Sequence, residues 1–168
     1  MTGEQATFLA EQMVALMQGE FPATCKVLAA VKDGTRDYRP DPKSRTAWEV
    51  ATHIATADIW FLDSIISGQF VFDPAAAKAA EAQFTTVADV VASYEKAFPA
   101  RLQQVKAMSG DELTRTVDFF GMFQKPAVGF LGMTNNHSVH HRGQLAAYLR
   151  ALGSKVPDIY GPSGDSEK

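Results

Sequence analysis

The sequence is poor in cysteine: Cys25 is the single thiol among 168 residues. One thiol cannot form an internal disulfide, and it leaves neither a thiol pair for redox chemistry nor a cysteine-based zinc site. Cys25 lies in a helical pattern with Leu28 and Ala29, where a small buried hydrophobic role is typical of cysteine. A lone thiol also suits a reducing compartment, so we expect a cytoplasmic protein.

Two further absences restrict the class of partner. No eighteen apolar residues occur together, and Met1 to Phe8 lacks a basic segment followed by an apolar run, so we expect neither a membrane span nor a secretion signal. The formal charge is −3 and Lys and Arg do not gather in one stretch, so nucleic acid is not an expected partner. We expect a small-molecule substrate instead.

Sustained alternation of apolar and polar residues, the mark of strands, is also missing. Four segments instead carry apolar residues at helical spacing. The first segment covers residues 4–31, and the second lies between a capping box at Thr46 and a glycine cap at Gly68. The third runs from Thr86 to about Met108, and the fourth from Pro126 to Gly153. This pattern predicts an all-α fold, a four-helix bundle with long or irregular connections.

The length of 168 residues suits one hydrophobic core. We therefore expect a single helical-bundle domain over residues 1–155 and a C-terminal tail, 156–168, with a mobile end. Prolines predict a bend at residues 19–22 and a kink or a break at Pro99. Residues 109–125, with Phe119, Phe120 and Phe123, predict an irregular and partly buried connection to which the sequence assigns no role.

Four histidines are present, and three of them lie within residues 137–141. Residues four apart share a helix face, so His137 and His141 can direct two imidazoles to one point, although His137 with His140 is a geometric alternative. The apolar stripe of the fourth helix contains His137 and His141, while His140 lies nearer its edge.

His53 lies in the core-facing stripe of the second helix, where an unbonded imidazole is costly and a metal would remove that cost. Three imidazoles suit zinc, nickel, copper or ferrous iron and leave a coordination position open.

The string His137-Ser-Val-His-His141-Arg142-Gly143-Gln144 reads H-x-x-x-H-R-G-Q. It resembles the closing motif of the DinB-like (YfiT-like) metalloenzyme superfamily of four-helix proteins, and the resemblance extends over essentially the whole chain. The resemblance implies that His53, His137 and His141 bind one divalent metal ion (Zn, Ni or Fe) and that His140 does not. It also implies a homodimer, close helix approach at Gly143, and local hydrogen bonds from Arg142 and Gln144.

Three functions are compatible with this resemblance. The first is a metal-dependent S-transferase that uses a low-molecular-weight thiol such as bacillithiol or mycothiol, since a cation lowers the pKa of a coordinated thiol. The second is a hydrolase that uses metal-bound water, and the third is a metal-binding or small-molecule-binding protein without turnover. The absence of an evident acid and base pair favours the first: Glu49 is expected as a cap partner, and Asp58 and Asp63 are expected to face solvent. No carboxylate is assigned a catalytic role.

Overall fold

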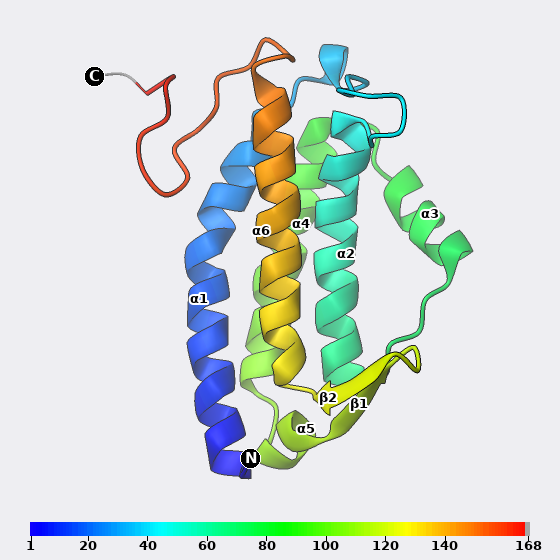
Figure 1. The fold of residues 1–168 in the computed structure, drawn as a ribbon, viewed down its shortest axis with the longest axis vertical. Helices are drawn as coiled ribbons and strands as arrows, with labels where there is room; N and C mark the ends of the chain where they lie inside the picture. Colours follow the sequence, from blue (N-terminus) through cyan, green and yellow to red (C-terminus); the bar gives the residue numbers. More distant parts are fainter. Residues whose placement is uncertain (167–168) are drawn as a thin grey trace.

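The computed structural model describes residues 1–166, and within that range four long helices lie side by side (Figure 1). They are α1 (Gly3–Ala29), α2 (Ala47–Ser67), α4 (Val87–Lys106) and α6 (Gly129–Leu149). The connections contain η1 (Asp33–Thr35), α3 (Pro74–Ala82), α5 (Gly110–Thr114) and the strands β1 (Thr116–Phe119) and β2 (Phe123–Pro126). The predicted all-α four-helix bundle is confirmed, with one small β-hairpin added.

α2 and α4 begin and end close to where the sequence predicts. Thr46 accepts a hydrogen bond from the backbone N–H of Glu49, whose carboxylate accepts the N–H of Thr46 in return. Gly68 ends α2 in the left-handed conformation, with φ of 78°. Thr86 and Asp89 form the same reciprocal cap on α4. Side-chain caps satisfy backbone groups that a helix leaves unpaired at its ends, so they fix the start and the register of each helix.

The two internal prolines do not break their helices. α1 continues through Pro22 and α4 continues through Pro99. Of the two alternatives predicted at Pro99, a kink or a break, the break is therefore wrong. A proline removes one backbone hydrogen bond of the helix, and the buried neighbours Phe98 and Leu102 keep α4 packed on the bundle around it.

The ends of α1 and α6 differ from the prediction. α6 begins at Gly129 rather than at Pro126, because the N–H groups of Ala127 and Val128 are bonded to carbonyls at the end of α5 and just beyond it. It ends at Leu149, before the left-handed Gly153, and α1 ends at Ala29 rather than at residue 31. Helix ends are the part of a sequence-based prediction that competing hydrogen bonds most easily displace.

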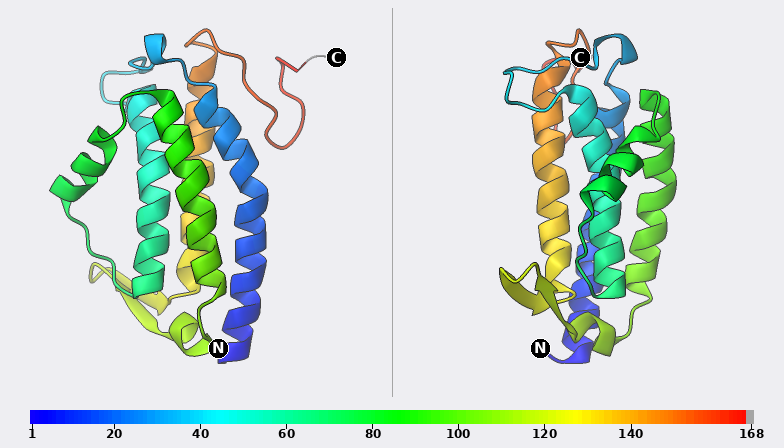
Figure 2. Two further views of the ribbon diagram at one scale, coloured as in Figure 1. Left: turned by 180° about the vertical axis from the view of Figure 1, so that it is seen from behind. Right: turned by 90° about the vertical axis from the view of Figure 1, so that its right-hand side faces the viewer.

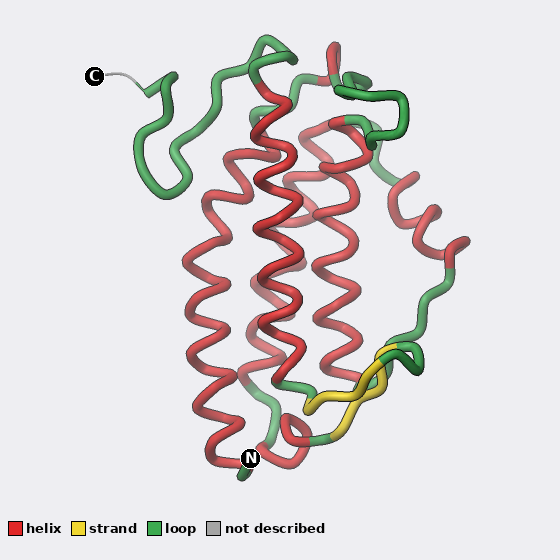
Figure 3. The backbone as a smooth tube through the Cα atoms, viewed as in Figure 1, coloured by secondary structure: helices red, strands yellow, loops and turns green. Residues whose placement is uncertain are grey.

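The connection over residues 109–125 is more regular than predicted. It contains α5 and an antiparallel hairpin in which Thr116 pairs with Pro126 and Phe119 with Phe123 (Figure 3). The turn holds Phe120 and Gly121 at positive φ, 55° and 71°. Each strand has only four residues, too few for alternation to be visible in the sequence. The hairpin lies at the end of the bundle where α1 begins (Figure 2).

One hydrophobic core fills the space between the long helices. Its fully buried members include Val14, Met17, Leu28, Ile54, Leu62, Tyr94, Leu102, Phe130 and Leu145. α3 stands outside this bundle, beside α2 (Figure 1). Among the described residues, none of the helices combines the length and the apolar composition needed to cross a bilayer.

The tail is attached to the bundle over its described part. The hydroxyl of Tyr160 donates to the carboxylate of Glu20 at 2.8 Å, and Arg150 pairs with Asp165 at 3.1 Å. The last residues, 167 and 168, for which the sequence predicts mobility, lie outside the described residues.

Candidate metal centre

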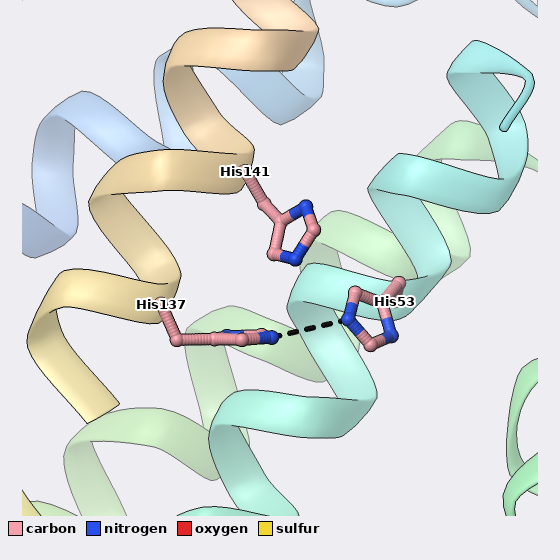
Figure 4. Close-up of side chains that lie close together, drawn as sticks. All are labelled: His53, His137 and His141. Carbon is pink, nitrogen blue, oxygen red and sulfur yellow. Dashed lines mark hydrogen bonds between the residues drawn. The ribbon is translucent and has the colours of Figure 1, made fainter. Parts of the chain in front are cut away.

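Three histidines from two helices converge near the middle of the bundle. His53 comes from α2, and His137 and His141 come from α6 (Figure 4). The centres of the three rings are 4.5 to 5.0 Å apart, and one ring nitrogen from each lies within 4.8 Å of the others. The shortest separation is 3.1 Å, between Nε2 of His53 and Nε2 of His137.

The helices determine this convergence. α2 and α6 pack against each other, and Val50 and Ile54, both fully buried, hold α2 in the core so that His53 lies at the edge of its buried face. His137 and His141 are one turn apart on the facing side of α6. The side chains of His53 and His137 are 20% and 18% exposed, so the group is partly shielded but open to solvent on one side.

The structure separates His140 from this group. Its side chain is exposed, and its ring contacts only the edge of the His141 ring among the three, at 4.9 Å between centres. The three-histidine group therefore contains His141 and not His140, in agreement with the residues that the motif implies.

Oxygen atoms lie behind all three imidazoles, on the Nδ1 side. Nδ1 of His137 is 3.2 Å from Oδ1 of Asp58, and Nδ1 of His141 is 3.0 Å from Oε1 of Gln144. Nδ1 of His53 is 4.0 Å from a carboxylate oxygen of Glu81. An oxygen acceptor favours the tautomer with its proton on Nδ1, which leaves the Nε2 lone pair free. In Figure 4 the second nitrogen of His141 is directed towards the other two rings.

Burial favours the neutral form of His53 and His141. It lowers the pKa of His53 to about 3, and Arg45 and the other two histidines act in the same direction. Burial also lowers the pKa of His141, against the opposing effect of its hydrogen bond to Gln144. A neutral imidazole is the form that coordinates a metal, because the coordinating nitrogen must carry a lone pair.

The donor set fits a divalent ion of the zinc type. Two nitrogens bound at about 2.0–2.1 Å in a tetrahedral arrangement lie about 3.3 Å apart, close to the 3.1 Å between the Nε2 atoms of His53 and His137. Three neutral imidazoles also suit nickel and ferrous iron. Three protein ligands are the number typical of catalytic rather than structural zinc sites.

Asp58 lies in a place that the sequence did not predict. It was expected to face solvent, yet it is 0% exposed and accepts a hydrogen bond from the hydroxyl of Tyr94 at 3.0 Å. Its position four residues after Ile54 and seven before Ile65 puts it on the buried stripe of α2, and this spacing is the signal that would have revealed it. The expectations for the other two carboxylates are confirmed: Glu49 caps α2, and Asp63 pairs with Arg101 at the surface.

Glu81 is the second carboxylate beside the histidines that the sequence did not reveal. It belongs to α3, a helix absent from the prediction, and is held against α2 by the fold of the connection. Burial raises its pKa, and the neighbouring Glu49 adds to this effect while Arg45 opposes it. Periodicity could not find this residue, since no described residue of α3 is buried.

The remaining motif residues have distinct environments. Arg142 is 2% exposed and reaches α1, where it pairs with the carboxylate of Glu20 at 2.6 Å. Gln144 makes the expected local bonds, to His141 and to the hydroxyl of Tyr148. The expected close helix approach at Gly143 is wrong, because a Cβ atom there would meet nothing within 4 Å.

The aromatic connection borders the histidine group. Phe119 and Phe123 pack on Phe130 of α6, and Trp60 of α2 lies parallel to Phe120. Phe61 continues this cluster to His137, with 5.1 Å between ring centres. A groove of about 620 Å³ runs along α6 beside the group, lined by Lys125, Gly129, Gly132, Met133, Asn136, His137 and His140.

The sequence profile of the DinB family matches residues 4–167. The chain belongs to the DinB family. The uncharacterized protein YrdA of Bacillus subtilis is 31% identical over 146 residues, which cover 86% of this chain and 83% of YrdA. A second protein of that organism, YjoA, also described as uncharacterized, is 28% identical over 125 residues, 73% of this chain and 77% of YjoA. The resemblance to DinB-like proteins inferred from the motif is thereby confirmed.

Solved structures of DinB-like proteins have the same fold. The crystal structure of YjoA superposes with a TM-score of 0.71 at 22% identity, covering 90% of this chain and 99% of that one. A DinB-like protein from Bacillus cereus gives a TM-score of 0.71 at 28% identity, covering 89% and 97%. This DinB-family chain therefore shares its whole fold with them, and their names assign no reaction.

Proposed function

We propose that this DinB-family protein binds one divalent metal ion through His53, His137 and His141 and uses it in an enzymatic reaction. The observation that carries the proposal is the convergence of three imidazole nitrogens within 4.8 Å, each ring backed on its Nδ1 side by an oxygen atom. The low pKa of His53 supports it further, because that side chain keeps its lone pair at neutral pH.

The reaction we propose is the transfer of a low-molecular-weight thiol, of the bacillithiol or mycothiol kind, to a small electrophile. The metal would supply the positive charge that turns a thiol into a thiolate at neutral pH. The chain's own residues would bind and orient: Phe61 forms an apolar wall beside His137, and the groove along α6 gives access from solvent. Glu81 lies 4.0 Å from Nδ1 of His53, so its part would be to orient that imidazole.

A metal-dependent hydrolase is the second candidate, because three protein ligands would leave a coordination position for water. Glu81 contacts Nδ1 of His53, on the side of the ring away from the three Nε2 atoms, so it is not assigned the role of general base. A binding protein without turnover is the third candidate. Three protein ligands argue against it, because a structural zinc site is normally closed by four.

We also propose a cellular location and an oligomeric state for the protein. By analogy with the resemblance that the motif carries, we propose a cytoplasmic homodimer acting on a small molecule. Analytical ultracentrifugation of the untagged protein, with and without metal, tests the dimer: a sedimentation coefficient of a monomer at micromolar concentration would refute it.

Elemental analysis tests the metal centre. The untagged protein should carry close to one zinc, nickel or iron per chain, and His53→Ala and His141→Ala should each lose most of it. His140→Ala is the matched control, since His140 lies on the same helix but outside the group, and it should keep the metal content of the parent. Equal metal content in all four proteins would refute the proposed ligands.

A second assay separates the three candidate functions. The metal-loaded protein is offered an electrophile with each candidate thiol, and then esters and amides without thiol. Conjugation that requires both thiol and metal supports the transferase, and cleavage that requires metal alone supports the hydrolase. Neither activity, in a protein that holds its metal, would support the binding protein.

A further inference from the structure

Asp58 is a carboxylate held away from water in the middle of the bundle. It is 0% exposed, and two side chains contact its oxygen atoms. The hydroxyl of Tyr94 donates to Oδ2 at 3.0 Å, and Nδ1 of His137 lies 3.2 Å from Oδ1. Burial, the largest cause, and the nearby Asp58 raise the pKa of Tyr94 well above its ordinary value, so the phenol keeps its proton and acts as a donor.

Such a side chain does not stabilise the fold by itself. Removing a carboxylate from water costs several kcal/mol, and neutral donors offset only part of that cost. The same stripe of α2 carries Ile54 and Ile65, and an apolar residue at position 58 would extend their packing. Asp58 therefore needs an explanation outside the stability of the bundle.

The hydrogen bonds around Asp58 fix the orientation of His137. Tyr94 occupies one carboxylate oxygen, so the other oxygen is left to accept the proton on Nδ1 of His137. The proton of that imidazole then sits on Nδ1, and the Nε2 lone pair faces His53, 3.1 Å away. Asp58 belongs to α2, Tyr94 to α4 and His137 to α6, so these contacts tie the three helices together at the level of the histidines.

We propose that Asp58 is the positioning residue of the histidine centre: it holds His137 with Nε2 directed at the ion, and its negative charge is offset by the bound divalent cation. This inference rests on the metal centre proposed above. Of the three oxygen acceptors behind the imidazoles, Gln144 is an amide and Glu81 is partly exposed, whereas Asp58 is a carboxyl group that is 0% exposed. In a low-dielectric surrounding a carboxylate interacts strongly with a cation a few ångströms away.

The experiment compares Asp58→Asn with the parent and with Asp63→Asn, a matched control five residues further along α2 that pairs with Arg101 at the surface. In Asp58→Asn, Tyr94 still donates to the remaining oxygen, so the amide NH₂ faces His137 and favours the opposite tautomer. Zn²⁺ affinity, measured by competition with a chromophoric chelator, should fall about 10- to 100-fold in Asp58→Asn and stay unchanged in Asp63→Asn.

Two further measurements separate positioning from a structural role. The metal-free Asp58→Asn protein should melt at the same temperature as the parent or higher, since a buried charge has been removed, whereas a structural role predicts a lower melting temperature. On a His137→Ala background, Asp58→Asn should lose much of its effect on Zn²⁺ affinity, because the imidazole through which it acts is absent. An equal loss on both backgrounds, or an unchanged affinity of Asp58→Asn, overturns the proposal.

A measurement on the metal-free protein tests the positioning role of Asp58 separately from the proposed metal centre. ¹⁵N NMR of the metal-free parent should show His137 protonated on Nδ1, and Asp58→Asn should shift it towards the Nε2–H tautomer. A parent that binds no ion but keeps the Nδ1–H form overturns the metal centre and not the positioning of His137. A parent with His137 protonated on Nε2 overturns the positioning role.

Discussion

His141 and Arg142 are neighbours in the chain, yet they belong to two polar clusters of opposite character. The arginine cluster, made of Arg142, Glu20, Thr24 and Tyr160, faces α1 and the tail. Arg142 pairs with the carboxylate of Glu20 at 2.6 Å and donates to the backbone oxygen of that residue at 3.1 Å. A full positive charge therefore meets a full negative charge, and the cluster is balanced within the chain.

The histidine cluster, made of His53, His137, His141 and Asp58, faces α2. Burial lowers the pKa of His53 and of His141, and the buried carboxylate of Asp58 contacts Tyr94 and His137. The difference suggests separate roles for two adjacent motif residues. We expect the arginine cluster to stabilise the bundle with or without metal, whereas the cation of the proposed metal centre would offset the charge of the Asp58 carboxylate.

The largest effect expected from this comparison follows from removing Arg142. Arg142→Met should lower the free energy of unfolding by about 3–5 kcal/mol, because it leaves the carboxylate of Glu20 without its charged partner. Urea denaturation of the metal-free protein measures this loss. The double variant Glu20→Leu/Arg142→Met should recover a substantial part of it, since no unpaired charge remains. A loss below about 1 kcal/mol in the single variant would mean that the arginine cluster is not the stabilising one.

The sequence predicts those parts of the fold that neighbouring residues determine, and it misses those that depend on distant contacts. The ends of α2 and the start of α4 were predicted because their capping residues act locally, within three positions of each other. The hairpin and α3 were missed because four-residue strands and a short exposed helix leave almost no periodic pattern. The start of α6 was misplaced because hydrogen bonds from Ala127 and Val128 to Arg115 and Leu113 hold the preceding residues outside the helix.

The candidate site divides in the same way. The pair His137 and His141 was readable from a spacing of four on one helix, with His140 as an alternative, and His53 from its place on the apolar stripe of α2. The motif then joined His53 to that pair across 84 residues and excluded His140. Asp58 and Glu81 were not read as part of the site, since a carboxylate within helical sequence normally faces solvent. Their contacts arise only when α2, α3, α4 and α6 pack, so they depend on tertiary structure that no local pattern contains.

Lowering the pH should reduce the free energy of unfolding through the histidine cluster, by less than the substitution of Arg142 does. Between pH 6.5 and about 3 the unfolded chain binds a proton at His53 and the folded protein does not, so the free energy of unfolding falls as the pH falls. His141, whose pKa is also lowered, acts in the same direction. The contribution of both is complete only above the ordinary pKa of histidine, and it is lost on the acidic side.

Thermal unfolding in a chelating buffer, from pH 7.5 to 4.5, tests this pH dependence. The metal-free parent should lose melting temperature across that range, and His53→Leu should lose less. His140→Gln is the matched control because His140 is exposed on α6, and it should follow the parent. If His53→Leu and the parent had the same slope, burial of the His53 imidazole could not be the cause.

The smallest effect concerns the hydroxyl that links the tail to the arginine cluster. Tyr160 has an exposed ring, but its hydroxyl donates to Glu20 at 2.8 Å and also contacts Arg142. Tyr160→Phe keeps the ring over the guanidinium and removes only these bonds, so we expect a loss of about 0.5–1.5 kcal/mol in the free energy of unfolding. On the Glu20→Leu/Arg142→Met background the same substitution should have no effect, because its partners are gone. Zn²⁺ affinity should be unchanged in Tyr160→Phe, since the arginine cluster faces α1 and the histidine cluster faces α2. A loss of affinity comparable to that of Asp58→Asn would show that the two clusters are coupled.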